Sequence, residues 1–151
     1  MEQFGPFGLV TTQDALRACN VQARTAAHHK AQLCHHSRRY DVLHDATDPG
    51  AIIKAVRGSI APDGSWFVAD IKCEHGVKAN VEDNPAAALC YGFSIQLCMS
   101  SSMSCEGGAG LGTLGLSVPT AERLLVEEGG FASVAVLPVD GPNTRFFEVL
   151  P

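Results

Sequence analysis

The pair His44-Asp45 has the residue types that proton-transfer chemistry needs. It follows the short semi-apolar run Tyr40–Leu43, which we expect to end a strand. Open α/β sheets bind ligands at the carboxyl ends of their strands, so the pair would stand where ligands bind. Because histidine titrates near neutrality, His44 could take a proton from a hydroxyl as a general base. The alternatives are a histidine that only hydrogen-bonds a neighbouring loop, or one that only contacts a cofactor.

A second group of potential ligands lies nearer the N-terminus. His28 and His35 are seven residues apart and would share a helix face, with His29, His36 and Cys34 beside them. A metal site needs several ligands that converge in a fixed shell. This Ala/Gln/Arg-rich segment shows no sustained apolar face that would hold such a shell. We therefore predict solvated histidines here and assign no metal ligand in the chain.

The stretch Gly110–Gly115 matches the pattern G-x-G-x-x-G of dinucleotide-binding loops. In a true pyrophosphate loop the pattern follows a strand, opens a helix and has an acid about 20 residues further on. Here Ser100–Glu106 precedes the glycines, Val118-Pro119 separates them from the next helix, and no acid stands at the required distance. A nicotinamide-dependent oxidoreductase, which the pattern would favour, is therefore our last-ranked hypothesis.

The composition favours one folded domain with a short appendage. Of the 151 residues, 46% are hydrophobic and 18% are charged, which rules out disorder throughout. No apolar run approaches the roughly 18 residues of a membrane span, and Met1–Gly5 shows no basic region followed by an apolar stretch. We predict a cytoplasmic protein with no membrane segment, whose six cysteines are free thiols.

The charge is distributed unevenly along the chain. Residues 1–39 hold five Lys/Arg against two acids, whereas residues 40–151 hold six against fourteen, and the formal net charge is −5. Nucleic-acid binding needs clustered Lys/Arg to neutralise phosphates. The acidic main part of the chain therefore excludes nucleic acid as a partner. The change near residue 40 divides the chain into an N-terminal segment of uncertain structure, 1–39, and a main domain, 40–151.

A strand–helix–strand unit should position the His44-Asp45 pair. Asp48 followed by Pro49 is typical of a helix N-cap and its first helical position. The apolar residues after it follow the spacing of one helix face, and we expect the helix to end before Pro62. The apolar face of this helix consists of Ile52, Ile53, Val56 and Ile60, and the turn Ala61–Gly64 follows it. The strand Ser65–Ile71 comes next and is apolar enough to be covered on both faces of the sheet. A unit of this size predicts a parallel crossover.

The rest of the chain predicts two more helical segments and two strands. Pro85–Met99 is rich in small and apolar residues and should be helical. Thr120 should cap a helix that ends at Gly129-Gly130. Two strands then finish the chain, Ser133–Pro138 and Thr144–Leu150, joined by a turn at Asp140–Asn143.

From Tyr40 onward, the order of elements and several short motifs resemble the C-terminal half of a class I S-adenosylmethionine-dependent methyltransferase. The run Tyr40–Pro49 resembles the end of the fourth strand and its loop, and Ile60–Gly64 resembles the turn before the fifth strand. Further motifs are similar, in order and spacing, to a branch that often carries a winged-helix domain: Asp70-Ile71-Lys72, Glu82-Asp83-Asn84, Cys98-Met99-Ser100, Gly108–Gly112 and Gly130-Phe131. The resemblance implies an α/β, Rossmann-like fold that transfers a methyl group from S-adenosylmethionine to a small-molecule acceptor.

The resemblance also implies roles for individual residues. His44 matches the general base of plant-type small-molecule O-methyltransferases, with Asp45 beside it to stabilise the imidazolium. Tyr40 and His44 would contact the cofactor. The glycine-rich loop would lie on the substrate side. Four further residues would line the substrate pocket, although each could instead be a core or surface residue: Lys72, Asn84, Cys98 and Met99.

The first three strands of that fold are not found in the sequence. Three such units need about 90 residues, and only 39 precede Tyr40, without an apolar strand followed by Gly-x-Gly. We therefore expect a truncated chain that lacks the glycine loop and the ribose-binding acid. The edge left by the missing strands predicts self-association. The competing hypothesis is a non-catalytic methyltransferase-like remnant that acts as an interaction module.

Overall fold

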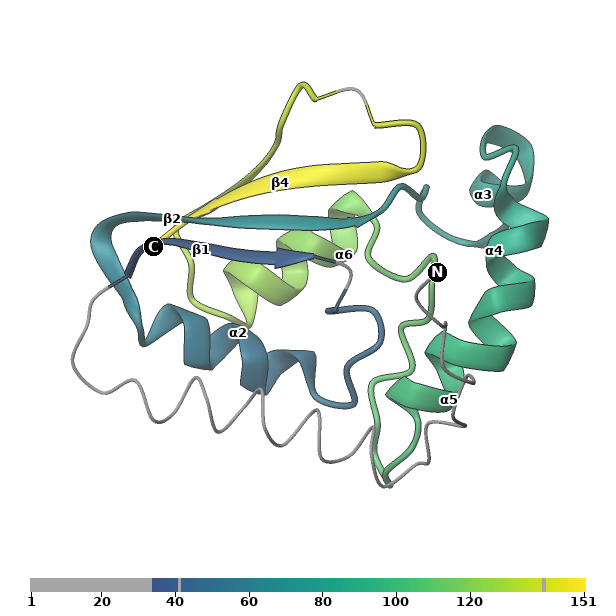
Figure 1. Ribbon diagram of the computed structural model, residues 1–151, viewed down its shortest axis with the longest axis horizontal. Helices are drawn as coiled ribbons and strands as arrows, with labels where there is room; N and C mark the ends of the chain where they lie inside the picture. The colour runs from purple at the N-terminus through teal and green to yellow at the C-terminus, as the bar shows by residue number, and fades with distance from the viewer. Residues whose placement is uncertain (1–33, 41, 140) are drawn as a thin grey trace, which may run out of the picture.

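The computed structural model describes residues 34–40, 42–139 and 141–151, the first of these ranges as backbone only. His28 and His29 lie outside the described residues, as does Asp140 of the predicted turn. Within the described ranges the chain forms a four-stranded sheet with helices on one side of it and a column of helices beyond its end (Figure 1). No helix in these ranges is long and apolar enough to cross a membrane.

The sheet confirms the predicted α/β class with a parallel crossover and an antiparallel end. Its strands are β1 (Cys34–Tyr40), β2 (Ile60–Ile71), β3 (Ser133–Val136) and β4 (Thr144–Leu150), in the order β1-β2-β4-β3. β1 and β2 are parallel, and β4 is antiparallel to both β2 and β3. β1 begins at Cys34, ahead of the boundary expected at Tyr40, so residues 34–39 belong to the sheet rather than to a separate segment.

The crossover helix α2 (Pro49–Arg57) begins where the sequence predicts. Asp48 Oδ1 accepts a hydrogen bond from the backbone N–H of Ala51 at 2.8 Å, which satisfies one of the donors that a helix N-terminus leaves open. The helix ends earlier than predicted, at Arg57, because Gly58 and Ser59 are poor helix formers. Ile60, which the sequence placed on the helix face, therefore opens β2.

The predicted turn Ala61–Gly64 is instead an irregularity inside β2. Cys34 pairs with Ile60 and His36 pairs with Ser65, so two steps along β1 match five along β2. The extra residues bulge from the ladder, which is how a sheet accommodates a proline and a glycine without breaking.

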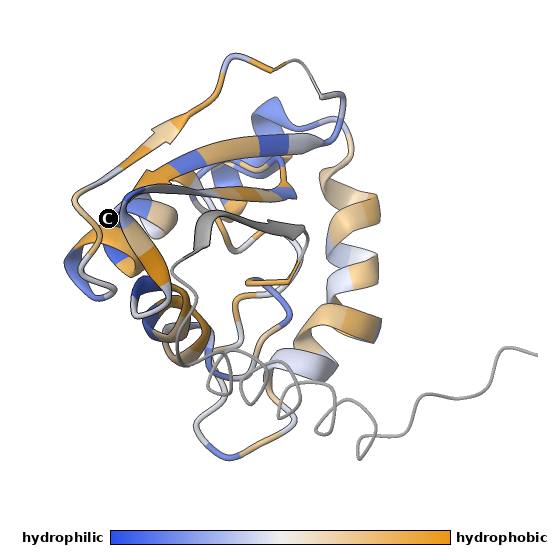
Figure 2. Ribbon diagram, turned by 60° about the vertical axis from the view of Figure 1, so that its left-hand side comes forward, coloured by the Kyte–Doolittle hydropathy of each residue, from blue (hydrophilic) through white to orange (hydrophobic). Residues whose placement is uncertain are grey.

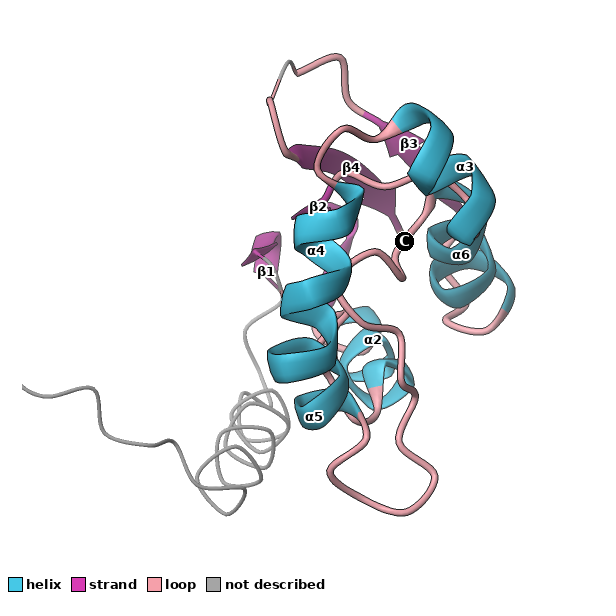
Figure 3. Ribbon diagram, turned by 90° about the vertical axis from the view of Figure 1, so that its right-hand side faces the viewer, coloured by secondary structure: helices cyan, strands magenta, loops and turns pink. Residues whose placement is uncertain are grey.

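One hydrophobic core lies between the sheet and the two helices that pack on the same side, α2 and α6 (Val118–Glu122) (Figure 3). Alternate residues of β2 face it, since Trp66 and Val68 are buried whereas Phe67 is half-buried. Phe67 stacks on Phe146 of β4 with ring centroids 5.6 Å apart, on the opposite face. Ala69, on the same face as Phe67, is 3% exposed, so the end of β2 is buried on both faces although α2 and α6 both lie on one side of the sheet.

The column beyond the strand ends contains the predicted helical segment and one helix that was not predicted. Pro85–Met99 forms α4 (Ala87–Phe93), the π-helical η1 (Ser94–Cys98) and the start of α5 (Met99–Ser102). α3 (Val77–Asp83) has exposed valines and is organised by a polar residue, Asn80. The Asn80 amide donates to the carbonyls of Glu74 and Gly76 and accepts from the Glu74 N–H. Apolar periodicity therefore could not reveal this helix.

The predicted cap of α6 is corrected by three residues. Ser117, not Thr120, is the N-cap, and its hydroxyl accepts from the Thr120 N–H at 3.4 Å and bonds to the Thr120 hydroxyl at 2.9 Å. Pro119 is allowed in the first turn, where its missing N–H is not needed. The helix continues as the π-helical η2 (Arg123–Glu127) and ends, as predicted, at the glycine pair, with Gly130 at φ 74°.

We expect the purified chain to self-associate through the apolar surface of α4 and η1. Four large apolar side chains along these two helices are exposed by 51% to 74%: Leu89, Phe93, Ile95 and Leu97. Much of the ribbon of this column has the hydrophobic colours in Figure 2. An apolar patch of this kind is normally covered in a stable monomer. Light scattering with size exclusion should show dimers or larger species that the double variant Leu89→Ser/Leu97→Ser reduces. A monodisperse wild-type monomer would contradict the prediction.

Candidate functional site

His44 is held in a tight turn at the carboxyl end of β1. The turn over residues 43–45 is closed by bonds from the Asp45 N–H to the Val42 carbonyl and from the Ala46 N–H to the Leu43 carbonyl. Leu43 is 1% exposed and belongs to the main core, which anchors the turn. His44 is 3% exposed, so its ring lies inside the protein just beyond the sheet.

The principal partner of His44 is Asp70, near the end of β2. His44 Nδ1 lies 2.8 Å from Asp70 Oδ1, and both side chains are at least 96% buried. The same Oδ1 accepts from the Ile71 N–H at 2.8 Å, which fixes the orientation of the carboxylate. Because an ionised carboxylate only accepts, His44 donates from Nδ1, and the neutral ring carries its basic lone pair on Nε2.

Two further residues with reactive side chains lie beside the histidine. His44 Nε2 is 3.3 Å from Asp45 Oδ1, and a ligand atom from each of His44, Asp45 and Cys98 lies within 4.8 Å of the other two. Asp45 Oδ1 is buried and has no hydrogen-bond partner among the described residues, and the same holds for Asp70 Oδ2. The structure thus brings together three residues that the sequence assigned to the site and adds a fourth, Asp70.

Asp70 is the residue that sequence reasoning missed as a site residue. It stands at the end of the almost continuously apolar run Ser65–Ile71 and is 1% exposed. A lone acid in a run that must be buried is a signal in itself, because a buried charge needs a partner. That partner is 26 residues earlier and becomes visible only when β1 and β2 pair in register.

The glycine-rich loop supports the histidine turn from outside. The Gly112 N–H donates to the His44 carbonyl at 3.2 Å, and the Ala109 N–H donates to the Thr47 carbonyl at 2.9 Å. Gly112 has φ 72°, and a Cβ there would come within 2.5 Å of Ser94 Oγ. The close approach of two loops and a helix therefore accounts for this glycine without any phosphate.

The remaining predicted site residues divide into two groups. Cys98 is buried in η1 and accepts a hydrogen bond from Thr113 Oγ1 at 2.8 Å, and Met99 is half-buried next to it. Lys72 is exposed, and its carbonyl accepts from the Asn84 amide at 3.2 Å. Neither Lys72 nor Asn84 has a described contact with the His44 cluster. The backbone of Tyr40 ends β1, and its side chain is outside the described residues.

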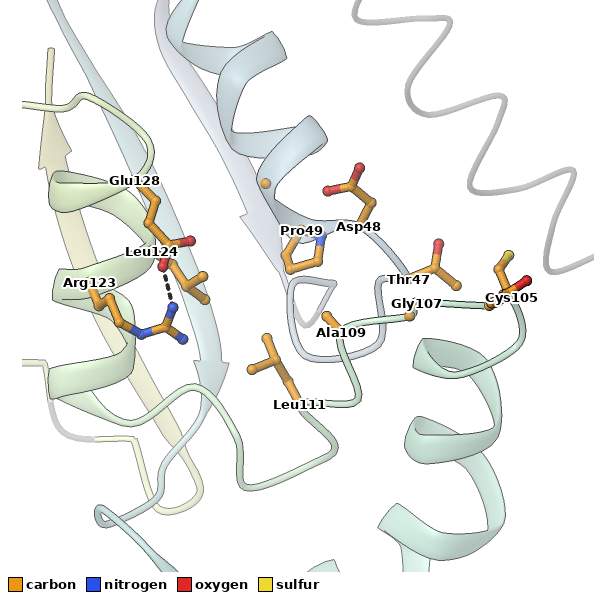
Figure 4. A pocket seen from close by; sticks show the side chains of 13 residues that line it. Thr47, Asp48, Pro49, Cys105, Gly107, Ala109, Leu111, Arg123, Leu124 and Glu128 are labelled. Atoms are coloured by element: carbon orange, nitrogen blue, oxygen red, sulfur yellow. Dashed lines mark hydrogen bonds and ion pairs between the residues drawn. The ribbon is translucent and has the colours of Figure 1, made fainter.

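A cavity of about 690 Å³ lies next to the histidine turn (Figure 4). It lies between the start of α2, the loop before Leu111, and η2, where Arg123 pairs with Glu128. Thr47 and Asp48 line one wall, but His44, Asp70 and Cys98 are not in the lining. The cavity is therefore next to the turn that holds His44, but its walls do not include His44 or its partners.

Burial disfavours the reactive, ionised form of one of the remaining described cysteines, Cys73. Burial raises the pKa of the Cys73 thiol from its ordinary 9.0 to about 12, in spite of the nearby Arg145 guanidinium. A thiol reacts and binds metals as the thiolate, so Cys73 is not a nucleophile or ligand at neutral pH.

Comparison with protein-family models and with curated proteins finds no match to this sequence. Solved structures do match. An O-methyltransferase family protein from Burkholderia thailandensis has a TM-score of 0.53 and 16% identity, over 85% of this chain and 32% of its own. PigF, solved with SAH, has a TM-score of 0.58 and 12% identity, over 85% and 33%. Human N-acetylserotonin methyltransferase, solved with SAM, has a TM-score of 0.52 and 16% identity, over 80% and 31%.

These likenesses identify the fold class. The described chain has part of the Rossmann-like fold of class I S-adenosylmethionine-dependent methyltransferases, as the sequence predicted. It spans about a third of the length of each of these three structures.

Proposed function

We propose that this chain is the catalytic-base half of an S-adenosylmethionine-dependent methyltransferase that acts on a small-molecule hydroxyl. The observation that carries the proposal is the buried bond between His44 Nδ1 and Asp70 Oδ1. It orients a histidine at the carboxyl end of a parallel strand, where α/β sheets bind ligands, with Nε2 turned away from Asp70 and toward Asp45. The similar O-methyltransferase structures support the reaction class.

His44 would remove the proton of the acceptor hydroxyl as the methyl group arrives. The proton would move from the acceptor hydroxyl to His44 Nε2, which leaves the acceptor oxygen as the nucleophile for the methyl group. Asp70 stabilises the resulting imidazolium through Nδ1, and Asp45 adds a second carboxylate 3.3 Å from Nε2. When bound, S-adenosylmethionine supplies an electrophilic methyl group on a sulfonium.

The residues present suit the reacting end of that cofactor. Asp45 Oδ1 and Asp70 Oδ2 are buried carboxylate oxygens without hydrogen-bond partners in the described part of the chain. Such concentrated negative charge beside His44 favours a positively charged sulfonium. Tyr40 and His44 would form this side of the cofactor site, and Cys98 and Met99 would line the acceptor side. The glycine loop and the ribose-binding acid would come from strands ahead of Tyr40.

We therefore expect the 151-residue chain to bind S-adenosylmethionine poorly. Most polar anchors of such a site belong to the first three strands, and the described residues offer only its methionine end. Calorimetric titration with S-adenosylmethionine and S-adenosylhomocysteine should show no saturable heat at micromolar concentrations. A micromolar dissociation constant would contradict the division of the site proposed above.

The activity itself is tested in a form of the protein that carries its upstream sequence. Labelled S-adenosylmethionine is incubated with a panel of phenols and aliphatic alcohols, and methylated products are identified by mass spectrometry. Transfer to a hydroxyl compound supports the proposal. Failure of every acceptor in a form that binds the cofactor would overturn it.

The exposed face of α4 and η1 favours the second candidate function, an interaction module without catalysis. Leu89 and Leu97 are more than 60% exposed, which suits a contact surface. The upstream sequence separates the two functions. A strand followed by Gly-x-Gly and a helix supports the enzyme, and its absence supports the module.

A further inference from the structure

We propose that His44, Asp45 and Cys98 form a three-ligand site for Zn²⁺. A nitrogen, a carboxylate oxygen and a sulfur, one from each residue, lie within 4.8 Å of one another around the carboxyl end of β1. No metal site was assigned from the sequence, because Cys98 is 53 positions along the chain from Asp45. The proposal stands on this geometry and does not depend on methyl transfer.

The distances suit a tetrahedral ion. With bonds of about 2.0–2.1 Å, two N/O ligands of tetrahedral zinc lie about 3.3 Å apart. His44 Nε2 and Asp45 Oδ1 are 3.3 Å apart. With a zinc–sulfur bond of about 2.3 Å, the sulfur would lie about 3.6 Å from each of the other two ligands. Because no two of the three ligand atoms are more than 4.8 Å apart, Cys98 Sγ needs to move by at most roughly 1 Å to reach these spacings.

The groups around the three ligands orient the ligand atoms in a way that suits a bound cation. Asp70 bonded to Nδ1 reproduces the carboxylate–histidine–metal arrangement, in which the second nitrogen is directed at the metal. Thr113 Oγ1 donates to Cys98 Sγ at 2.8 Å, which helps to hold the sulfur in place beside the other two ligands. Asp45 Oδ1 is buried without a hydrogen-bond partner among the described residues, and a metal ion would supply one.

The ligand chemistry selects zinc among the common ions. One imidazole, one carboxylate and one thiolate form a mixed N/O/S set, which suits Zn²⁺ and does not suit Mg²⁺ or Ca²⁺. The two anionic ligands balance the charge of the ion. Three protein ligands leave a fourth position for water or for an oxygen of a small molecule. If the proposed methyl transfer is also correct, zinc and the base function exclude each other, because both use His44 Nε2.

Cobalt binding to the metal-free 151-residue chain tests the site directly. We expect one Co²⁺ to produce a thiolate-to-cobalt absorption band that Zn²⁺ abolishes by displacement. Cys98→Ser should remove the band, and His44→Gln should weaken Co²⁺ binding at least tenfold. Asp70→Asn, which acts only through His44, should weaken it by about 10–100-fold. Circular dichroism of each variant confirms that it folds.

Matched variants separate this site from other cysteines and from the histidine-rich segment. Cys105→Ser replaces an exposed cysteine and should leave the band unchanged. A variant with alanine at His28, His29, His35 and His36 and serine at Cys34 should also keep it. A band that survives Cys98→Ser, or disappears in either control, would overturn the proposal. In wild type, Zn²⁺ should protect Cys98 from alkylation while Cys105 stays reactive, and equal labelling with and without Zn²⁺ would also overturn it.

Discussion

Replacing His44 with alanine is expected to lower turnover by about 10²–10⁴-fold in a form of the protein that carries its upstream sequence. That range is the usual effect of losing a general base. The affinity for S-adenosylmethionine should change far less, because the polar anchors of the cofactor lie elsewhere. Single-turnover methylation at neutral pH, with the acceptor saturating, measures the chemical step directly.

The interpretation of this variant depends on its folding. His44→Ala leaves the Asp70 carboxylate buried without its partner, which can cost about 3–5 kcal/mol of stability. His44→Gln keeps a polar group facing Asp70 and should fold better while losing the base equally. His75→Ala is the matched control, since His75 is exposed and its described bond is to Ser117. Equal single-turnover rates in wild type and His44→Gln would remove His44 from the mechanism.

The elements that the sequence predicted correctly depend on local chemistry. Asp48 caps α2 through its own side chain, and β4 has the predicted bounds because alternation and a turn define it. Ser117 and Thr120 show the limit of such reasoning. Both residue types can cap a helix. Ser117 is the N-cap here because the residue before it, Leu116, is buried in the core, which sets where the helix begins.

The sequence predicted the residues of the candidate site that are neighbours in the chain, but not the contacts that they make with distant residues. His44 and Asp45 are adjacent, so residue type and position at a strand end were enough to select them. Asp70 reaches His44 through the pairing of two strands, and Cys98 reaches it through the path of a helix beyond the sheet. The sequence can mark Asp70 as a buried acid that needs a partner, but which distant segments meet depends on tertiary packing, so the partner cannot be named from local sequence.

Replacing Asp70 with asparagine is expected to lower turnover by about 10²–10⁴-fold while leaving KM nearly unchanged. The asparagine amide can donate to His44 Nδ1, which would place the ring proton on Nε2. A ring in that tautomer cannot accept a proton from the hydroxyl. Asp70→Asn also lacks the charge that stabilises the imidazolium.

A structural role alone for Asp70 would give a different set of results. Loss of stability without a change in tautomer would leave turnover of the folded fraction intact. Nitrogen NMR of the metal-free 151-residue chain should show Nδ1 protonated in wild type and Nε2 protonated in Asp70→Asn. Asp70→Glu retains a carboxylate and should recover part of the lost rate, which Asp70→Asn cannot. An unchanged tautomer together with wild-type turnover would show that the Asp70 carboxylate does not position His44 for catalysis.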